Sequence, residues 1–373
     1  MKSSSSSGKP ANKSPGRHGI NLLLILLLLF LSPACSKAND QTLSENTAAK
    51  AELVLAGNTG DITGNTSVDK EDNSTEPPIQ FSGPCFVLIP ERARPGEPVT
   101  IVFGDNFAGK QLRNPEAVLL DSRERRITKA AFFNLPTEDG ELMAAILAIP
   151  TTALTGNAAI RIETRDGVLK DLPFIIESRE FISETIPLNQ ENTDLRTVPD
   201  PQKTAESDHL YKILSTTGKD IYGGGQFMPP VSSTRRTSYF GDRRVYRYAD
   251  NSSDTSIHAG IDYGVPTGTE VRACAAGKVV FAGPRIVTGN SVILEHLPGI
   301  YSLYYHMDSI SITEGAIVET SVLLGLSGST GLATGPHLHW EIRVSGENAD
   351  PDAFISRAVL DKKDILNRMK DSK

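Results

Sequence analysis

The stretch His337-Leu338-His339-Trp340-Glu341-Ile342-Arg343-Val344 alternates polar and apolar residues, and it is the clearest indication of secondary structure in the carboxy-terminal part of the chain. Alternation with a period of two is typical of a β-strand that has one buried face. The pattern predicts that His337, His339 and Glu341 share one face, and that Trp340 points away from them into the core. Such a strand presents two imidazoles and a carboxylate to one side.

A second polar cluster lies upstream, at His258-Ala259-Gly260-Ile261-Asp262. The glycine within it, together with Gly264 and Pro266 after it, disfavours a helix. Extended backbone also places residues four apart on one face, so we expect His258 and Asp262 to converge from a strand. Two histidines and one carboxylate with an open fourth position form the ligand set of a catalytic zinc site.

Apolar runs between the two clusters predict an antiparallel β-domain whose strands line one groove. The expected strands are Val271–Ala282, Ser291–His296, Tyr301–Met307 and Leu338–Val344. His296 ends one of these runs, and we predict a structural role for it. The later run Ala353–Met369 is amphipathic and is predicted to form a packing helix.

These motifs together resemble the LytM/lysostaphin-type zinc peptidases of family M23, which cut peptides in bacterial cell-wall peptidoglycan. The family's H-x-x-x-D motif corresponds to residues 258–262, its H-x-H motif to 337–339 and its Tyr-x-His element to 304–306. The resemblance covers about residues 228–356, and it implies an antiparallel β zinc-peptidase domain there.

The resemblance also implies a role for each polar residue. His258, Asp262 and His339 would bind Zn²⁺, while His306 and His337 would orient or deprotonate the attacking water and stabilise the oxyanion. Zinc lowers the pKa of bound water toward ~7, and a neutral histidine can accept the proton. The expected function is an exported zinc endopeptidase that hydrolyses peptidoglycan stem peptides or cross-bridges. The alternative is a non-catalytic envelope protein that binds peptidoglycan or activates another cell-wall hydrolase.

Alternation alone leaves the role of His337 open. It places His337 on the face of His339, where a fourth protein ligand would close the site and make it structural. A two-residue step of about 6.6–6.8 Å along a strand makes it hard for both rings to reach one ion at about 2 Å. We therefore predict His339 as the ligand and His337 as its catalytic neighbour.

The rest of the chain is predicted to be mainly β, with an immunoglobulin-like β-sandwich at residues 83–177. Seven short apolar runs separated by turn residues support it, namely Cys85–Ile89, Val99–Phe103, Ala117–Leu120, Ile127–Phe133, Leu142–Ile149, Ala158–Ile162 and Leu172–Ile176. We expect a spacer, or a module that docks an envelope protein partner. Residues 178–227 would form a connector with a short helix at 205–214, and residues 357–373 a helical tail.

The amino terminus is predicted to be an export signal. Residues 1–21 are basic, and Leu22–Leu31 is an uncharged run too short for a bilayer that needs about 20 residues. Residues 1–34 would be the signal peptide. Cys35 follows small residues, as in a bacterial lipobox, so we predict a lipid on Cys35 that anchors the protein to a membrane of the cell envelope. Cleavage before an unlipidated Cys35 is the alternative, and residues 35–82 would be a disordered tether.

Charge and cysteine counts exclude other classes of protein. The 373 residues include 45 acids and 38 bases, a formal charge of −7, which argues against a nucleic-acid partner. Three cysteines are too few for a disulfide-stapled domain or a four-thiolate zinc module. The sequence allows two states for Cys85 and Cys274. They could form a disulfide between the two domains, or each could be a buried thiol.

Overall fold

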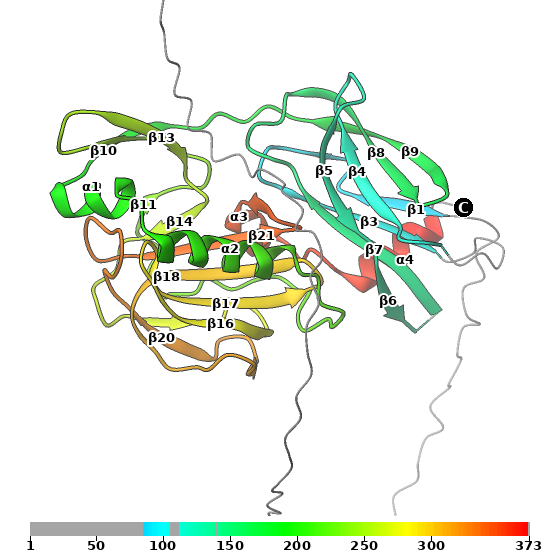
Figure 1. Cartoon of the computed structure of the whole chain (residues 1–373). Helices are drawn as coiled ribbons and strands as arrows, with labels where there is room; N and C mark the ends of the chain where they lie inside the picture. The colour runs from blue at the N-terminus through cyan, green and yellow to red at the C-terminus, as the bar shows by residue number, and fades with distance from the viewer. Residues whose placement is uncertain (1–84, 105–111, 139, 372–373) are drawn as a thin grey trace, which may run out of the picture. The chain divides into compact units, whose positions relative to one another are not determined.

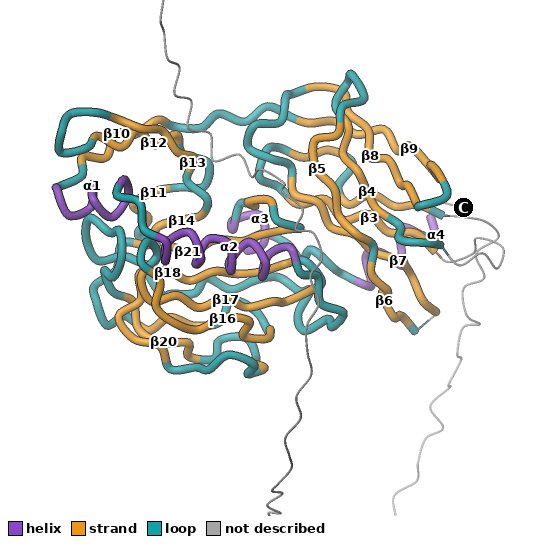
Figure 2. Tube along the Cα trace, in the orientation of Figure 1, coloured by secondary structure: helices purple, strands orange, loops and turns teal. Residues whose placement is uncertain are grey.

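The computed structural model describes residues 85–104, 112–138 and 140–371 (Figure 1). Strands predominate among them, which confirms the mainly β prediction (Figure 2). The predicted signal peptide, the tether and Cys35 lie outside the described residues. Within the described ranges, every helix is too short or too polar to cross a bilayer.

Two sheets pack face to face in the amino-terminal described region. The strand order in the first sheet is β1 (Phe86–Ile89), β3 (Pro98–Gly104), β7 (Gly140–Ala148) and β6 (Phe133–Thr137). The strand order in the second sheet is β2 (Arg92–Ala93), β9 (Gly167–Ile176), β8 (Gly156–Thr164), β4 (Glu116–Leu120) and β5 (Arg126–Ala131). The strands pair antiparallel except for the parallel pair β2–β9. Ile101 and Leu147 of one sheet share a buried core with Leu119 and Ile160 of the other. The region is therefore a β-sandwich, and its immunoglobulin-like character stays a prediction.

One predicted strand of this sandwich was wrong as a single element. The run 127–133 divides into β5 and β6, because β5 pairs with β4 in one sheet while β6 pairs with β7 in the other. The chain thus crosses between the two sheets within this run.

A larger sheet holds the polar clusters. Its strand order is β11 (Arg236–Ser238), β14 (Gly260–Tyr263), β21 (Leu338–Val344), β18 (Ile300–Ile310), β17 (Gly289–Leu297), β16 (Gly277–Arg285) and β19 (Ile317–Val318), with β15 (Glu270–Arg272), β20 (Leu323–Ser327) and β22 (Glu347–Ala349) paired off this path. Trp340 on β21 is fully buried, on the face that alternation predicted.

The segment before this sheet is more structured than the predicted connector. It contains β10 (Ser183–Pro187), α1 (Gln190–Thr197) and α2 (Pro201–Ser215). β10 pairs in parallel with β12 (Arg243–Arg247), which pairs with β13 (Ser253–Ile257). The helix α2 lies over β16–β18 (Figure 1), and Leu214 at its end belongs to the same buried cluster as Ile293 of β17 and Tyr301 of β18.

Two further elements differ from prediction. The run 271–282 is two strands, β15 and β16, because residues 273–276 turn between them and bury Cys274. The run 353–369 is two helices, α3 (Pro351–Ser356) and α4 (Lys362–Asp371), separated by the extended Arg357. Asp361 accepts hydrogen bonds from the amides of Lys363 and Asp364, the second and third residues of α4, so a new helix starts there.

Candidate active site

Neighbouring strands bring the first two candidate ligands together. β14 and β21 pair antiparallel with Asp262 directly opposite His339. The strands approach closely at Gly260, where a Cβ atom would lie 2.8 Å from the carbonyl carbon of Trp340. A glycine is therefore required at this position for the register that places the two polar side chains side by side.

The third candidate reaches the same point from the two-residue link between β13 and β14. β13 ends at Ile257 and β14 begins at Gly260, so His258 lies between two strands, and the prediction of continuous extended alternation from His258 to Asp262 was wrong in this detail. The His258 amide donates to Asp242 O at 2.9 Å, and Nδ1 of the ring lies 2.7 Å from Tyr239 O. Backbone contacts rather than strand pleating thus orient this ring.

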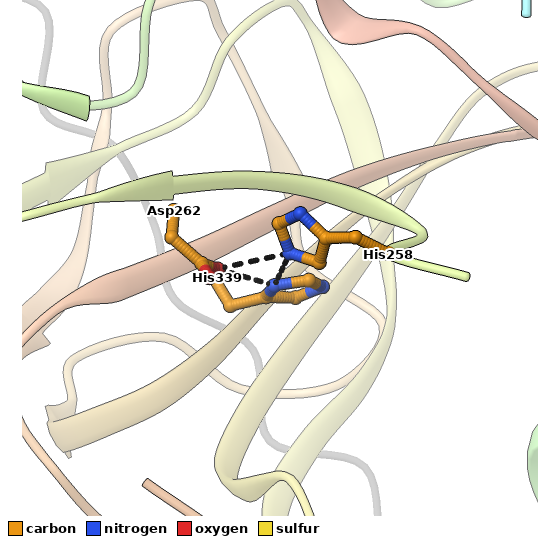
Figure 3. Close-up of side chains that lie close together, drawn as sticks. All are labelled: His258, Asp262 and His339. Atoms are coloured by element: carbon orange, nitrogen blue, oxygen red, sulfur yellow. Dashed lines mark hydrogen bonds and ion pairs between the residues drawn. The ribbon is translucent and has the colours of Figure 1, made fainter. Parts of the chain in front are cut away.

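The three side chains converge on one point (Figure 3). His258 Nε2 lies 3.2 Å from Asp262 Oδ1 and 3.0 Å from His339 Nδ1, and His339 Nδ1 lies 2.6 Å from Asp262 Oδ1. All three residues are buried. Donors bound to a tetrahedral ion at about 2.0–2.1 Å stand about 3.3 Å apart, so this spacing is close to that of a metal site.

The protonation of the two rings tests whether a cation fits. A carbonyl only accepts, so His258 Nδ1 carries the proton and its Nε2 presents a lone pair. His339 Nε2 lies 2.9 Å from Glu341 Oε1, so its proton is on Nε2 and Nδ1 presents a lone pair. With neutral rings, two nitrogen lone pairs and one carboxylate oxygen face one another, and a cation between them removes the repulsion.

The electrostatics of the metal-free site agree with this conclusion. Burial alone would lower the pKa of His339, but Asp262 and Glu341 raise it to about 9. Burial would raise the pKa of Asp262, but the two histidines hold it well below its usual range. A proton on His339 therefore compensates the carboxylates, and a divalent ion would displace that proton when it binds.

The other two histidines stand beside this cluster and are neutral. The rings of His306 and His337 lie 4.7 Å apart, and His337 Nε2 is 3.9 Å from Asp262 Oδ1. Each Nδ1 donates to a carbonyl at 2.8 Å, from His306 to Thr330 and from His337 to Gly335, so each Nε2 is the basic nitrogen. Burial lowers the pKa of both rings, that of His306 to about 3.

His306 reaches the site because the backbone departs from strand alternation. Tyr305 lies directly opposite His339 and stacks on its ring, with 5.6 Å between centroids. Strict alternation would turn the next residue to the other face. His306 instead has φ of +60°, a left-handed conformation that is uncommon for a non-glycine residue and that lets both side chains line the site.

Two ion pairs that the sequence did not predict hold the ligands. Glu341 was expected on the ligand face, and its Oε1 contacts Nε2 of His339, the ring nitrogen that faces away from the other two candidate ligands. Arg343 donates from Nη2 to Oε2 of Glu341 at 2.6 Å. Arg244 donates from Nη2 to Asp262 Oδ2 at 2.6 Å and from Nε to Glu184 Oε1 at 2.8 Å. Glu184 lies 78 positions before Asp262, so no local motif could have revealed this contact.

Four of the five candidate residues, Asp262, His306, His337 and His339, line a groove with a volume of about 610 Å³. His258 lies behind Asp262 and His339 and is not part of the lining, whereas Ile186, Leu188 and Arg196 of the β10–α1 segment are. The segment also contacts the loop before β21, because Asn192 Nδ2 donates to Ala333 O at 3.2 Å. Residues outside the predicted peptidase domain therefore help to form the groove.

Two further buried residues, His296 and Cys274, have structural roles. His296 is fully buried, with Nδ1 2.8 Å from Ala276 O and Nε2 2.7 Å from Ser302 Oγ, and burial lowers its pKa to about 4. Cys274 is a buried free thiol whose Sγ lies 3.7 Å from His296 Nε2. The structure thus favours a buried thiol at Cys274 over a disulfide with Cys85.

Comparisons with known proteins identify the class of the carboxy-terminal domain. Residues 256–351 match the model of Peptidase family M23, so this part of the chain is an M23 peptidase domain, as the sequence motifs predicted.

Individual relatives match the same part of the chain. It is 41% identical over 128 residues to the DD-carboxypeptidase/endopeptidase Mpg of Neisseria meningitidis serogroup B, covering 34% of this chain and 29% of that protein. It is 29% identical over 173 residues to the peptidoglycan DD-endopeptidase ShyA of Vibrio cholerae, covering 46% and 40%. A solved catalytic domain of the prophage-encoded M23 protein EnpA from Enterococcus faecalis is 31% identical, with a TM-score of 0.29, over 34% of this chain and 95% of that chain. The matches thus span less than half the length of either curated relative.

Proposed function

We propose that the protein is an exported zinc endopeptidase that hydrolyses peptide bonds of peptidoglycan stem peptides or cross-bridges. The observation that carries the proposal is the convergence of His258 Nε2, Asp262 Oδ1 and His339 Nδ1 beside two neutral histidines in a groove. Relatives named peptidoglycan DD-endopeptidase and DD-carboxypeptidase/endopeptidase support the substrate class.

The donor set fits zinc, with two imidazoles and one carboxylate as protein ligands and one position open. When bound, Zn²⁺ would polarise the scissile carbonyl and acidify the attacking water. The chain's own residues would do the remaining work. Glu341 holds His339 through Nε2, and Arg244 holds Asp262 through Oδ2, so the ligand atoms are oriented before substrate arrives.

Proton transfer is proposed for His306 and His337. Their Nδ1 protons are engaged by backbone carbonyls, so each Nε2 presents a free lone pair at neutral pH. One ring would accept the proton of the attacking water, and the protonated ring could then donate to the leaving amine. While it holds that proton, the same ring could hydrogen-bond the developing oxyanion, a contribution of roughly 3–4 kcal/mol for a well-placed donor, and the neutral second ring would orient the attacking water through Nε2.

For the leader, Cys35 and the β-sandwich we propose the roles that the sequence predicted. The leader would export the protein, and a lipid on Cys35 would tether it in the cell envelope. The sandwich would act as a spacer or as a docking module for an envelope protein, and the overall acidic charge leaves nucleic acid out of the proposed partners.

The direct test is digestion of purified peptidoglycan by the zinc-loaded chain, with the products identified by mass spectrometry. The proposal expects products with new amino and carboxyl termini. The chain should form none of these products after its metal is removed by a chelator, and it should form them again when zinc is added back. Stoichiometric zinc without any cleavage, together with binding to peptidoglycan, would support the non-catalytic alternative instead.

A further inference from the structure

Three arginines line the groove, and they differ in how their charges are compensated. Arg244 is bonded to two carboxylates, as described above, and Arg196 donates to Asp254 at 3.1 Å. Arg235 is exposed and has no carboxylate within 4.0 Å among the described residues. It is therefore a cation in the groove whose charge the protein does not neutralise.

The side chain of Arg235 is nevertheless held in place. Its Nη1 donates to Gly264 O at 3.2 Å, and the Gly264 amide donates to Arg235 O at 3.1 Å. A Cβ atom at Gly264 would lie 3.0 Å from Cζ of the guanidinium and closer still to Nη1, so the glycine makes room for it. One of the five N–H bonds of the guanidinium is used in this way, and the described residues offer no partner to the others.

The position of this guanidinium relates it to the candidate metal ligands. Gly264 follows Asp262 by two residues just beyond the end of β14, a distance of about 6.6–6.8 Å along extended chain. A bound peptide advances about 3.4 Å per residue. A group one or two residues from the cleaved bond would therefore lie near Arg235. Apolar side chains also line the groove, namely Val287, Leu332, Ala333 and Pro336.

We propose that Arg235 forms a subsite for a carboxylate of the peptide substrate, one or two residues from the cleaved bond. The inference rests on the proposed peptidase function. It adds a recognition element, a substrate carboxylate, that the metal ligands do not contact. The planar guanidinium matches a carboxylate with two parallel hydrogen bonds, and its position against Gly264 lowers the entropy lost on binding.

The test uses two synthetic stem peptides that differ only in one group, a free carboxylate or its carboxamide next to the cleaved bond. The wild-type full chain should cleave the carboxylate peptide with a kcat/KM about 10- to 150-fold higher than that of the carboxamide. Arg235→Gln should cleave both at the lower rate, with unchanged zinc content. Arg235→Lys should retain part of the preference for the carboxylate peptide, because lysine keeps the positive charge but cannot make two parallel hydrogen bonds to a carboxylate. Arg247→Gln, at an exposed arginine of β12 outside the groove lining, should keep all of it.

Equal rates for the two peptides with the wild-type chain, or a preference that survives in Arg235→Gln, would overturn the subsite. Binding to the His337→Ala chain, measured by calorimetry, provides a readout that needs no cleavage. A carboxylate peptide that binds at least tenfold more tightly than its carboxamide, with the difference lost in the added Arg235→Gln variant, supports the subsite. Equal Kd values reject it, whereas a lack of cleavage of either peptide counts against the proposed peptidase function.

Discussion

The guanidinium of Arg244 donates to Oδ2 of Asp262 at 2.6 Å, and this contact leaves Oδ1 as the carboxylate oxygen that faces His258 and His339. Both residues are largely buried, so the contact is well protected from water. Arg244 thereby determines that Asp262 offers one oxygen rather than two to an ion. Its role is positioning, and it acts on chemistry through Asp262.

Replacement of Arg244 by Met should therefore weaken zinc binding. The loss of a group that orients a metal ligand costs about 10- to 100-fold in affinity. The measurement is competition between the apo-protein and a chromophoric chelator. Arg247→Met, on the same strand but outside the groove lining, should bind zinc as the wild type does. Wild-type affinity in Arg244→Met would remove Arg244 from the site.

Variants of His306 and His337 should separate turnover from metal binding. Loss of a general acid or base costs about 10²–10⁴-fold in rate, and neither ring is a predicted ligand. His306→Asn is the better variant at that position, because asparagine tolerates the left-handed backbone with φ of +60°. Activity and zinc content should be measured on the same samples of His306→Asn and His337→Ala. Zinc loss from a well-folded His337→Ala variant would make His337 a ligand.

Gly260→Ala should disrupt the pairing of β14 with β21. Its Cβ atom would clash with the Trp340 carbonyl group, and overpacking of this kind costs about 1–3 kcal/mol of stability. Thermal unfolding should show a lower Tm, accompanied by weaker zinc binding. Gly283→Ala on β16 is the matched control, since the nearest atom to its Cβ is 3.6 Å away. Equal Tm values for the two variants would argue against the close approach.

Cys35→Ala should abolish incorporation of labelled fatty acid and release the protein from membranes. The predicted tether separates Cys35 from the catalytic domain, so the intrinsic activity of the released protein should be unchanged. A lipid label that persists in the variant would show that another residue carries it.

Sequence reasoning reached the candidate site because its signals are local. His337, His339 and Trp340 belong to one alternating stretch of sequence. The structure assigns the strand to 338–344, with the tryptophan buried and His337 in an isolated bridge just before it. The structure also brings His258 and Asp262 to His339, while the roles of these residues stay predictions.

The features that sequence reasoning missed depend on non-local contacts or on one backbone angle. The Arg244–Glu184 pair joins β12 to β10 through a parallel pairing that has no sequence signature. Tyr239 O and Asp242 O hold the ring and the amide of His258, which lies between two strands, and the conformation of His306 departs from regular strand geometry. Period-two patterns describe regular strands only, so each of these features lay outside their reach.

The central claim is that His258, Asp262 and His339 hold one zinc ion that the reaction requires. The most direct measurement is the zinc content of the purified wild-type chain and of the His258→Ala, Asp262→Ala and His339→Ala variants, measured by atomic emission alongside peptidoglycan cleavage. We predict one zinc ion per wild-type chain, and loss of both zinc and cleavage in each folded variant. Stoichiometric zinc in His339→Ala, or cleavage by the zinc-free wild-type chain, would contradict the assignment.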